Sequence, residues 1–296
     1  MQLDAVIQVA IGLIFVWLVL SVGVMQAQEW VENLFTWRSQ YLEQAVRDML
    51  DDPKMSDKFF QHPSIQALYR RSGLNKMPPW IPPQRFAKVM LDLFANAGKS
   101  PEELPEGEWS LSKMQENLKS VQQNNPGLAR KFGYILQGVG DKTAKLDEKL
   151  SKWYAGMEDW YNDTMNMVSL EYKKFSQRLA FLIGLLIAVF LNVDSVFIAT
   201  ELWQQPTARA VIVAQAQAQV EAGAPPTDFS QAVESLPFPV GWRADSLPSD
   251  FQGWGIKAFG FLLSGLAAAQ GAPFWFDALR KLVGFRSRAE QEAKEK

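Results

Sequence analysis

The sequence predicts an all-α membrane protein with three transmembrane helices and a cytoplasmic helical domain inserted between the first and second spans. Three stretches are almost free of charge and reach the roughly 20 apolar residues that a helix needs to cross a bilayer. The segments between them carry apolar residues at helical spacing, without the alternation typical of strands. The three apolar stretches are Ala5–Met25, Ala180–Thr200 and Trp254–Phe276.

The composition narrows the classes of function. The chain has a formal net charge of -2, so no overall positive field favours nucleic acid as a partner. It has no cysteine and one histidine, His62, which leaves no thiolate chemistry and no multi-histidine metal site within one chain. We therefore expect no cofactor and assign no catalytic, cofactor-binding or metal-binding residue.

Residues 1–26 are predicted to be a retained transmembrane helix and not a cleaved signal peptide. The start carries Asp4 and neither lysine nor arginine, so the basic region of a signal peptide is missing. We expect this helix to continue beyond the membrane without a break to Leu50, because neither glycine nor proline interrupts residues 27–50. It should end before Pro53, since proline cannot continue the helical hydrogen-bond ladder.

Residues 27–178 are predicted to form the cytoplasmic helical domain. Prolines in "PPWIPP" precede one of its helices, and Gly98 is the expected C-cap of that helix. A long helix starts near Leu146 and runs directly into the second span. The helices expected before it cover residues 86–94 and 109–121 and a segment that begins near Pro126.

The second half of the chain is expected to cross the membrane twice. A second span is followed by an external loop with an amphipathic helix from about Pro206, a third span and a cytoplasmic tail. Their predicted bounds are 179–201, 202–253, 254–276 and 277–296.

The distribution of lysine and arginine predicts the orientation. Basic residues gather on the cytoplasmic side of membrane spans. They precede the second span and follow the third, whereas the loop at 202–253 carries only two arginines. We therefore expect the N-terminus and this loop outside and the C-terminus in the cytoplasm. The basic residues concerned are Lys173, Lys174, Arg178, Arg280, Lys281, Arg286 and Arg288.

Asn192 and Asp194 stand out because they lie in one of the most apolar stretches, "FLNVDSVF" at residues 190–197. A carboxylate inside a span costs about 3 kcal/mol on insertion scales, so it should be neutral, paired or in contact with water. One interpretation places Asp194 on a transport pathway. In the structural alternative, which we favour, it pairs with Lys257; a water-filled vestibule or a protonated carboxyl between helices would also be structural.

Small residues recur at every fourth position in the second and third spans. Such stripes let membrane helices approach closely, and a polar member can bond across the contact. We expect the two stripes to pack on each other, with the Asn192 amide bonding to the other helix and Asp194 on a different face. The stripes are Gly184, Ala188 and Asn192 in the second span, and Gly260, Ser264, Ala268 and Ala272 in the third.

His62, in "QHPSI", allows two readings. It could serve as a catalytic base, but a lone histidine before a proline is more often a capping or packed residue, and we favour that reading. "GYILQGVG" lacks the lysine and hydroxyl of a phosphate-binding loop.

Several motifs resemble those of a family of uncharacterised bacterial integral membrane proteins. They are "AIGLIFVWLVLSV", "HPSI", "PPWIPP", "MNMVSLEYKK", "NVDSVFIATELW" and the closing "GAPFWFDALRKLVGFR". The resemblance touches most of the chain and implies a bacterial inner-membrane setting. It brings no activity and therefore no catalytic residue.

The function we expect first is a non-enzymatic inner-membrane scaffold or accessory protein whose cytoplasmic domain binds a partner. Besides the lipid bilayer, its partners would be a second copy or another membrane or cytoplasmic protein. The alternative is a subunit of a small oligomeric channel or transporter that uses Asp194. A membrane-associated hydrolase comes third, because one histidine and no cysteine leave little catalytic chemistry.

Overall fold

A computed structural model describes residues 2–35, 37–71, 78, 80–95, 126–138, 146–236, 241–242 and 247–294. These residues form helices and turns and include no strand, so the all-α prediction is confirmed. The chain divides into two compact units. We call Met1–Leu34 with Phe175–Lys296 the apolar unit, and Phe35–Lys174 the inserted unit.

The inserted unit is a set of short helices around an aromatic core. Four of its helices begin with a proline, whose fixed φ angle and missing N–H suit the first turn. Asp52 caps one of them by accepting from the backbone N–H groups of Lys54 at 2.8 Å and Met55 at 3.1 Å. The helices are α2 (Trp37–Leu50), α3 (Pro53–Gln61), α4 (Pro63–Arg71), α5 (Pro83–Ala95), α7 (Pro126–Gly138) and the first part of α8 (Leu146–Phe190).

Large side chains hold these helices together. Phe86 packs between Phe59 and Tyr161, and their ring centroids lie 5.4 and 4.6 Å from its own. The Tyr161 hydroxyl donates to the Ile81 carbonyl at 2.9 Å, so this buried phenol has its partner. The helix expected at 109–121 and the C-cap expected at Gly98 lie outside the described residues.

The expected uninterrupted helix from the first span to Leu50 is wrong. Two residues separate the end of α1 (Gln2–Leu34) from the start of α2 at Trp37. The Trp37 N–H donates to the Phe35 carbonyl at 2.8 Å, and the two rings stack with centroids 4.8 Å apart. Neither glycine nor proline marks this position, so the local sequence carries no stop signal.

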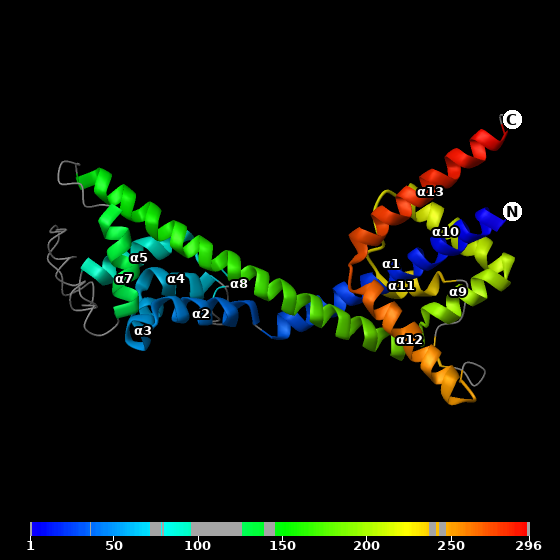
Figure 1. The fold of residues 1–296 in the computed structure, drawn as a ribbon, viewed down its shortest axis with the longest axis horizontal. Coiled ribbons are helices and arrows are strands. Elements are labelled where there is room, and N and C mark those ends of the chain that lie inside the picture. The colour runs from blue at the N-terminus through cyan, green and yellow to red at the C-terminus, as the bar shows by residue number, and fades with distance from the viewer. Residues whose placement is uncertain are drawn as a thin grey trace. The chain divides into compact units, whose positions relative to one another are not determined.

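In the apolar unit, α1 lies at the centre. Nearly all of its side chains from Ile11 to Val24 are buried against the surrounding helices, which Figure 1 shows grouped around it. A helix that is apolar on every side is typical of such a position. The neighbours are α9 (Ser195–Gln204), α10 (Pro206–Glu221), α11 (Phe229–Glu234), α12 (Phe251–Ala268) and α13 (Ala272–Lys294).

Helix α13 runs back along α1 in the opposite direction. Its first residue, Ala272, lines a pocket together with Val22 of α1, and further along Arg286 Nε lies 3.6 Å from Asp4 Oδ1. The N-terminus and the Arg286 end of α13 are therefore at the same end of this unit, as Figure 1 shows. The orientation expected from the basic residues, with the N-terminus outside and the C-terminus in the cytoplasm, stays a prediction.

Within the described residues, α1 is the helix that is long and apolar enough to cross a membrane, from Asp4 to Glu32. The pairs α8–α9 and α12–α13 pass the same test only when each bent pair counts as one span. The bends are 53° and 95°, so the prediction of two further continuous spans needs correction. The chain can thus cross a membrane once, or up to three times.

The second bend has a clear local cause. Gly271 has a φ of +88°, a conformation that glycine adopts without strain, and it separates the end of α12 from the start of α13. The Trp275 indole then donates to the Ala267 carbonyl at 2.6 Å, which also accepts from the Gln270 N–H at 3.1 Å, and this bond ties the first turn of α13 to the end of α12.

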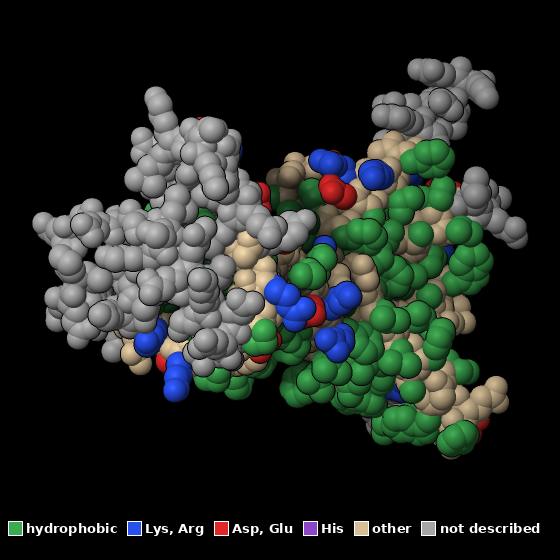
Figure 2. Space-filling model, turned by 60° about the vertical axis from the view of Figure 1, so that its left-hand side comes forward, with side chains coloured by type: hydrophobic (Ala, Val, Ile, Leu, Met, Phe, Trp, Pro, Cys, Tyr) green, Lys and Arg blue, Asp and Glu red, His purple; other side chains and the backbone are tan. Residues whose placement is uncertain are grey.

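The apolar unit exposes an extensive hydrophobic surface, seen over much of the right-hand part of Figure 2. A large exposed apolar surface marks contact with a membrane or a protein. Helix α13 differs from α8, α9 and α12 in that it also exposes charged side chains. Asp277 and Lys281 are exposed on it, and Arg280 pairs with Asp277 at 3.0 Å. The exposed apolar side chains of α8, α9 and α12 include Leu182, Leu186, Phe190, Phe197, Trp203, Trp254, Ile256, Phe259, Leu262 and Leu266.

Candidate functional site

The polar residues of "FLNVDSVF" form a break between α8 and α9. Asn192 has a φ of +53°, in the left-handed region that asparagine tolerates better than most residues. Its backbone N–H donates to the Val189 carbonyl at 3.1 Å, and that of Val193 donates to Ala188 at 2.8 Å. This pair of bonds is the Schellman motif that ends helices, so Asn192 stops α8.

Asp194 starts the next helix. It is the N-cap of α9 in extended conformation, with one carboxylate oxygen accepting from Val196 N–H at 2.9 Å and Phe197 N–H at 3.1 Å. These two donors have no partner within the helix. In an apolar environment an unsatisfied N–H costs several kcal/mol, which explains a carboxylate at this position.

A distant segment satisfies the carbonyl groups at the break. The Gly241 N–H donates to the Leu191 carbonyl at 2.8 Å, and the Trp242 indole donates to Val189 at 2.8 Å. The Asn192 amide in turn donates to the Gly241 carbonyl at 3.1 Å. Asn192 therefore bonds to this segment, and the bond that we expected across to the third span stays a prediction.

Two buried serines join the break to its neighbours. The hydroxyl oxygens of Ser195 and Ser264 lie 2.8 Å apart, and Ser264 Oγ donates to the Val193 carbonyl at 2.7 Å. On the other side, the Trp17 indole of α1 donates to Ser195 Oγ at 2.9 Å. Three helices thus meet in one hydrogen-bonded cluster.

Lys257 lies close to this cluster but does not form the expected ion pair. Both Lys257 (6% exposed) and Asp194 (4%) are buried, yet no N–O distance within 4.0 Å joins them. The Lys257 ammonium instead sits 5.2 Å from the ring centres of Trp242 and Phe261, a cation–π arrangement. One carboxylate oxygen of Asp194, Oδ1, instead caps α9, so the expected direct ion pair between Asp194 and Lys257 needs correction.

The small residues of the two stripes come together around the break. A Cβ on Gly260 would overlap the Asp194 carboxylate, so only glycine fits there. A Cβ on Gly184 would lie 3.1 Å from the Gly265 carbonyl and 3.3 Å from Ala268 Cβ, where α8 and α12 touch. Ala188 is buried at the end of α8, whereas Ala272 belongs to α13 and lines a pocket away from this contact.

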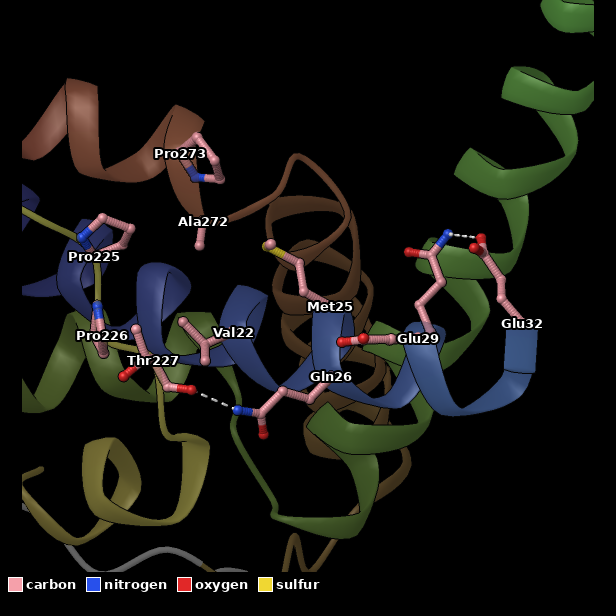
Figure 3. Close-up of a pocket in the computed structure, with 11 residues that line it drawn as sticks. Val22, Met25, Gln26, Glu29, Glu32, Pro225, Pro226, Thr227, Ala272 and Pro273 are labelled. Atoms are coloured by element: carbon pink, nitrogen blue, oxygen red, sulfur yellow. Dashed lines mark hydrogen bonds between the residues drawn. The ribbon is translucent and has the colours of Figure 1, made fainter. Parts of the chain in front are cut away.

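That pocket lies beside the second half of α1 and has a volume of about 570 Å³. Figure 3 shows the Glu29 carboxylate pointing along α1 toward Met25, while Glu32 lies at the far edge beside Gln28. The Gln26 amide donates to the Thr227 carbonyl at 2.7 Å and so ties α1 to the loop after α10. The lining is Val22, Met25, Gln26, Gln28, Glu29, Glu32, Pro225, Pro226, Thr227, Ala272 and Pro273.

His62, in the inserted unit, acts as a cap. Its Nδ1 accepts from the Ser64 N–H at 3.2 Å at the start of α4, and its Nε2 faces Asp92 Oδ2 at 3.5 Å. Burial lowers the pKa of His62, and this outweighs the Asp92 carboxylate, which raises it; Lys88 lowers it further. Burial likewise raises the pKa of Asp92. A half-buried neutral imidazole that holds a helix end fits the capping interpretation.

The polar groups between α8 and α9 stabilise a break in the helix inside the apolar unit. The donors and acceptors named at the break serve the backbone or one another. Among the described residues, no group of three or more histidine, aspartate or glutamate side chains could hold a metal ion. No protein-family model, no curated protein and no solved structure matches the chain.

Sequence reasoning did not anticipate Trp17, Ser195 or the segment Gly241–Trp242 as parts of this cluster. One signal was present. Asparagine is a frequent stop residue and aspartate a frequent N-cap, so "NVD" within an apolar run carries the signature of one helix ending and another beginning. The docking of Gly241 and Trp242 had no such signal, because they lie 49 and 53 residues from their partners.

Proposed function

We propose that this chain is a non-enzymatic scaffold or accessory protein of the bacterial inner membrane, and that its inserted unit binds a partner protein in the cytoplasm. The observation that carries the proposal is the use of Asn192 and Asp194 as helix caps. The side chains of Asn192 and Asp194 make hydrogen bonds to the backbone and so stabilise the fold. We therefore infer that the apolar unit serves as a membrane anchor. The family resemblance supports the bacterial setting.

The cytoplasmic placement of the inserted unit rests on charge. Lys173, Lys174 and Arg178 come directly before the apolar part of α8, and basic residues next to a span favour the cytoplasmic side.

Trp80 is the strongest candidate for a partner contact. Its neighbour Ile81 is fully buried and its carbonyl is held by the Tyr161 hydroxyl, so the backbone at this point is anchored. Trp80 itself is 59% exposed. A large aromatic side chain on a fixed backbone loses little entropy on binding, and tryptophan is enriched among the residues that dominate interface energies.

Photocrosslinking in native membranes tests this proposal. A photoreactive phenylalanine analogue placed at Trp80 should give a defined cross-linked product, because its side chain projects into the partner. The same analogue at Lys58, an exposed residue of α3, is the matched control. In addition, Trp80→Ala should remove the partner from pull-downs while Lys58→Ala keeps it. Equal products at both positions, or recovery unaffected by Trp80→Ala, would contradict the proposal.

The channel or transporter alternative depends on Asp194 facing an aqueous path. Its burial, its two backbone partners and the close approach of Gly260 favour the structural role. Ion flux in proteoliposomes separates the two functions, because Asp194→Asn keeps a capping side chain but removes the charge. A flux that is present in the unaltered protein and lost in Asp194→Asn would favour the channel.

A further inference from the structure

The pocket beside α1 is preformed. Three prolines line it, Pro225 and Pro226 in the loop after α10 and Pro273 in the first turn of α13, and proline restricts the backbone on both sides of the opening. The Gln26–Thr227 bond fixes the loop to α1. The volume of the pocket, about 570 Å³, falls within the range typical of small-molecule sites.

Its lining combines an apolar floor with negative charge. Val22 and the prolines supply apolar surface, and among the described residues that line the pocket the charged ones are Glu29 and Glu32. Glu29 points along the opening toward Met25, whereas Glu32 meets the Gln28 amide at 3.4 Å on the outer side. A ligand with an anionic group would meet a carboxylate and no cation, so charge complementarity selects a positive group.

The position of the pocket along α1 indicates that the ligand also has an apolar part. The apolar stretch of α1 ends at Met25, and the polar run that follows begins at Gln26, so the pocket spans the change from apolar to polar surface. A ligand that matches this gradient has an apolar chain and a charged head, with the chain against the prolines and Met25 and the head at Glu29.

We propose that this pocket binds an ammonium group carried on an apolar chain. The Glu29 carboxylate accepts charge-assisted hydrogen bonds from the ammonium, which are roughly twice as strong as neutral ones. Two sources supply this chemistry, the amine headgroup of a membrane lipid and a free alkylamine. The pocket residues belong to the apolar unit and Trp80 to the inserted unit, so loss of ligand binding and loss of partner binding are measured as independent results.

Calorimetric titration of the full chain in a neutral detergent is the direct test. The probes are octylammonium, octanol and octanoate, which share a chain and differ in charge. We expect octylammonium to bind at least about tenfold more tightly than octanol, a difference of about 1.4 kcal/mol, and octanoate to bind more weakly than both. Equal binding of octylammonium and octanol would overturn the proposal.

Two variants and one control locate the site. Glu29→Gln should weaken octylammonium about tenfold and leave octanol unchanged, because the amide keeps the size and loses the charge. Thr227→Trp, an exposed rim position whose side chain makes no bond to Gln26, should block both probes. Glu234→Gln, an exposed carboxylate of α11 outside the pocket, should change nothing. Octylammonium binding that survives both variants would place it elsewhere and refute the assignment.

Nanodiscs distinguish the two sources. If a lipid amine is the occupant, discs of phosphatidylethanolamine should suppress octylammonium binding by competition, relative to discs of phosphatidylglycerol. If a free amine is the occupant, the affinity should be the same in both. Either result must depend on Glu29, so Glu29→Gln is measured in each lipid, and independence from Glu29 counts against the proposal.

Discussion

Asn192 and Asp194 show how two polar residues can serve the backbone in an apolar setting. Asparagine tolerates the left-handed conformation with which α8 ends, and the aspartate side chain receives the first N–H groups of α9. Each replaces a hydrogen bond that the broken helix cannot make for itself. Both residues therefore contribute through the position and geometry of their side chains.

Replacing Asp194 tests whether the cap or the charge matters. Asp194→Ala removes the acceptor for Val196 and Phe197 and should lower the free energy of unfolding by about 1–2 kcal/mol. Asp194→Asn keeps an acceptor and should stay close to the unaltered protein. Thermal or denaturant unfolding in detergent measures both. Equal losses in the two variants would show that the carboxylate charge, for example toward Lys257, is what stabilises the fold.

His62 gives the inserted unit a pH-dependent stability. Burial holds its pKa in the folded protein below the unfolded value of about 6.5, so the unfolded chain binds the proton more readily. The stabilisation is complete above pH 6.5 and is lost as the pH falls toward the folded pKa, by at most about 1.4 kcal/mol per pH unit. Unfolding of the full chain between pH 7.5 and 5.5 should show this decline.

His62→Asn is the matched control for that decline. Asparagine is also a favoured capping residue, so the Ser64 N–H keeps an acceptor, but the side chain does not titrate in this range. Since the chain has no other histidine, the stability of the variant should be nearly flat over the same interval. A variant with the same pH slope as the unaltered protein would assign the effect to other groups.

Among the elements, α12 carries the closest packing. Its small residues let α8 and the capped end of α9 approach, and Gly260 accommodates the Asp194 carboxylate directly. This is the packing of small residues expected between membrane helices, although one of the surfaces it meets is a helix break and not a straight helix.

A pair of glycine substitutions in α12 measures that contact. Gly260→Ala places a methyl group where the Asp194 carboxylate lies and should destabilise the protein by about 1–3 kcal/mol through overpacking. Gly255→Ala adds the same methyl group to the same helix where no atom lies within 4 Å, and should stabilise it by about 0.5–1 kcal/mol. Unfolding in detergent compares them, and equal effects would mean that the contact is absent.

The outer faces of α12 and α13 should meet different surroundings. Phe259 is exposed on the apolar α12, whereas Arg280 is exposed beside Asp277 on α13. A charged face directed at lipid is unfavourable, so α13 should face water or the headgroups. Because the chain has no cysteine, Phe259→Cys and Arg280→Cys report unambiguously. In liposomes a water-soluble maleimide should label Arg280→Cys and leave Phe259→Cys largely unreacted; the opposite pattern would reverse the assignment of the two faces.

For the whole molecule, the antiparallel course of α1 and α13 brings Asp4 and Arg286 to the same end of the apolar unit. We therefore expect Asp4 and Arg286 to lie on the same side of a membrane. The distribution of basic residues predicts the two termini on opposite sides, and that orientation stays a prediction. The charge pattern could not detect the 95° bend at Gly271 that turns α13 back along α1.

Cysteine labelling in intact spheroplasts tests this topology. Gln2→Cys and Lys296→Cys should react with a membrane-impermeant maleimide from the same side, both before lysis or both only after it. Asp163→Cys, exposed on α8 in the inserted unit, should react only after lysis if that unit is cytoplasmic. Labelling of the two terminal cysteines from opposite sides would show that the Asp4–Arg286 contact does not exist in the membrane.

The sequence alone determined the all-α class, the apolar α1 and many of the helix starts. These features rest on local causes: the 3.6-residue period of apolar side chains, the length of an uncharged stretch and the fixed φ of proline. The starts of α7 at Pro126 and α10 at Pro206 follow from such signals, and the structure confirms both. The polar residues Asn192, Asp194 and Lys257 were also recognisable as exceptions within apolar stretches.

Only the tertiary structure decided what those exceptions do. Asp194 has two possible partners in principle, Lys257 across the helix contact or the backbone of its own break, and a composition pattern cannot choose between them. In the structure Asp194 caps α9, while Gly241 and Trp242 reach the freed carbonyls of α8 from about 50 residues away and complete the break. Contacts between residues about 50 positions apart depend on the path of the whole chain, and the local periodicity of the sequence does not predict them.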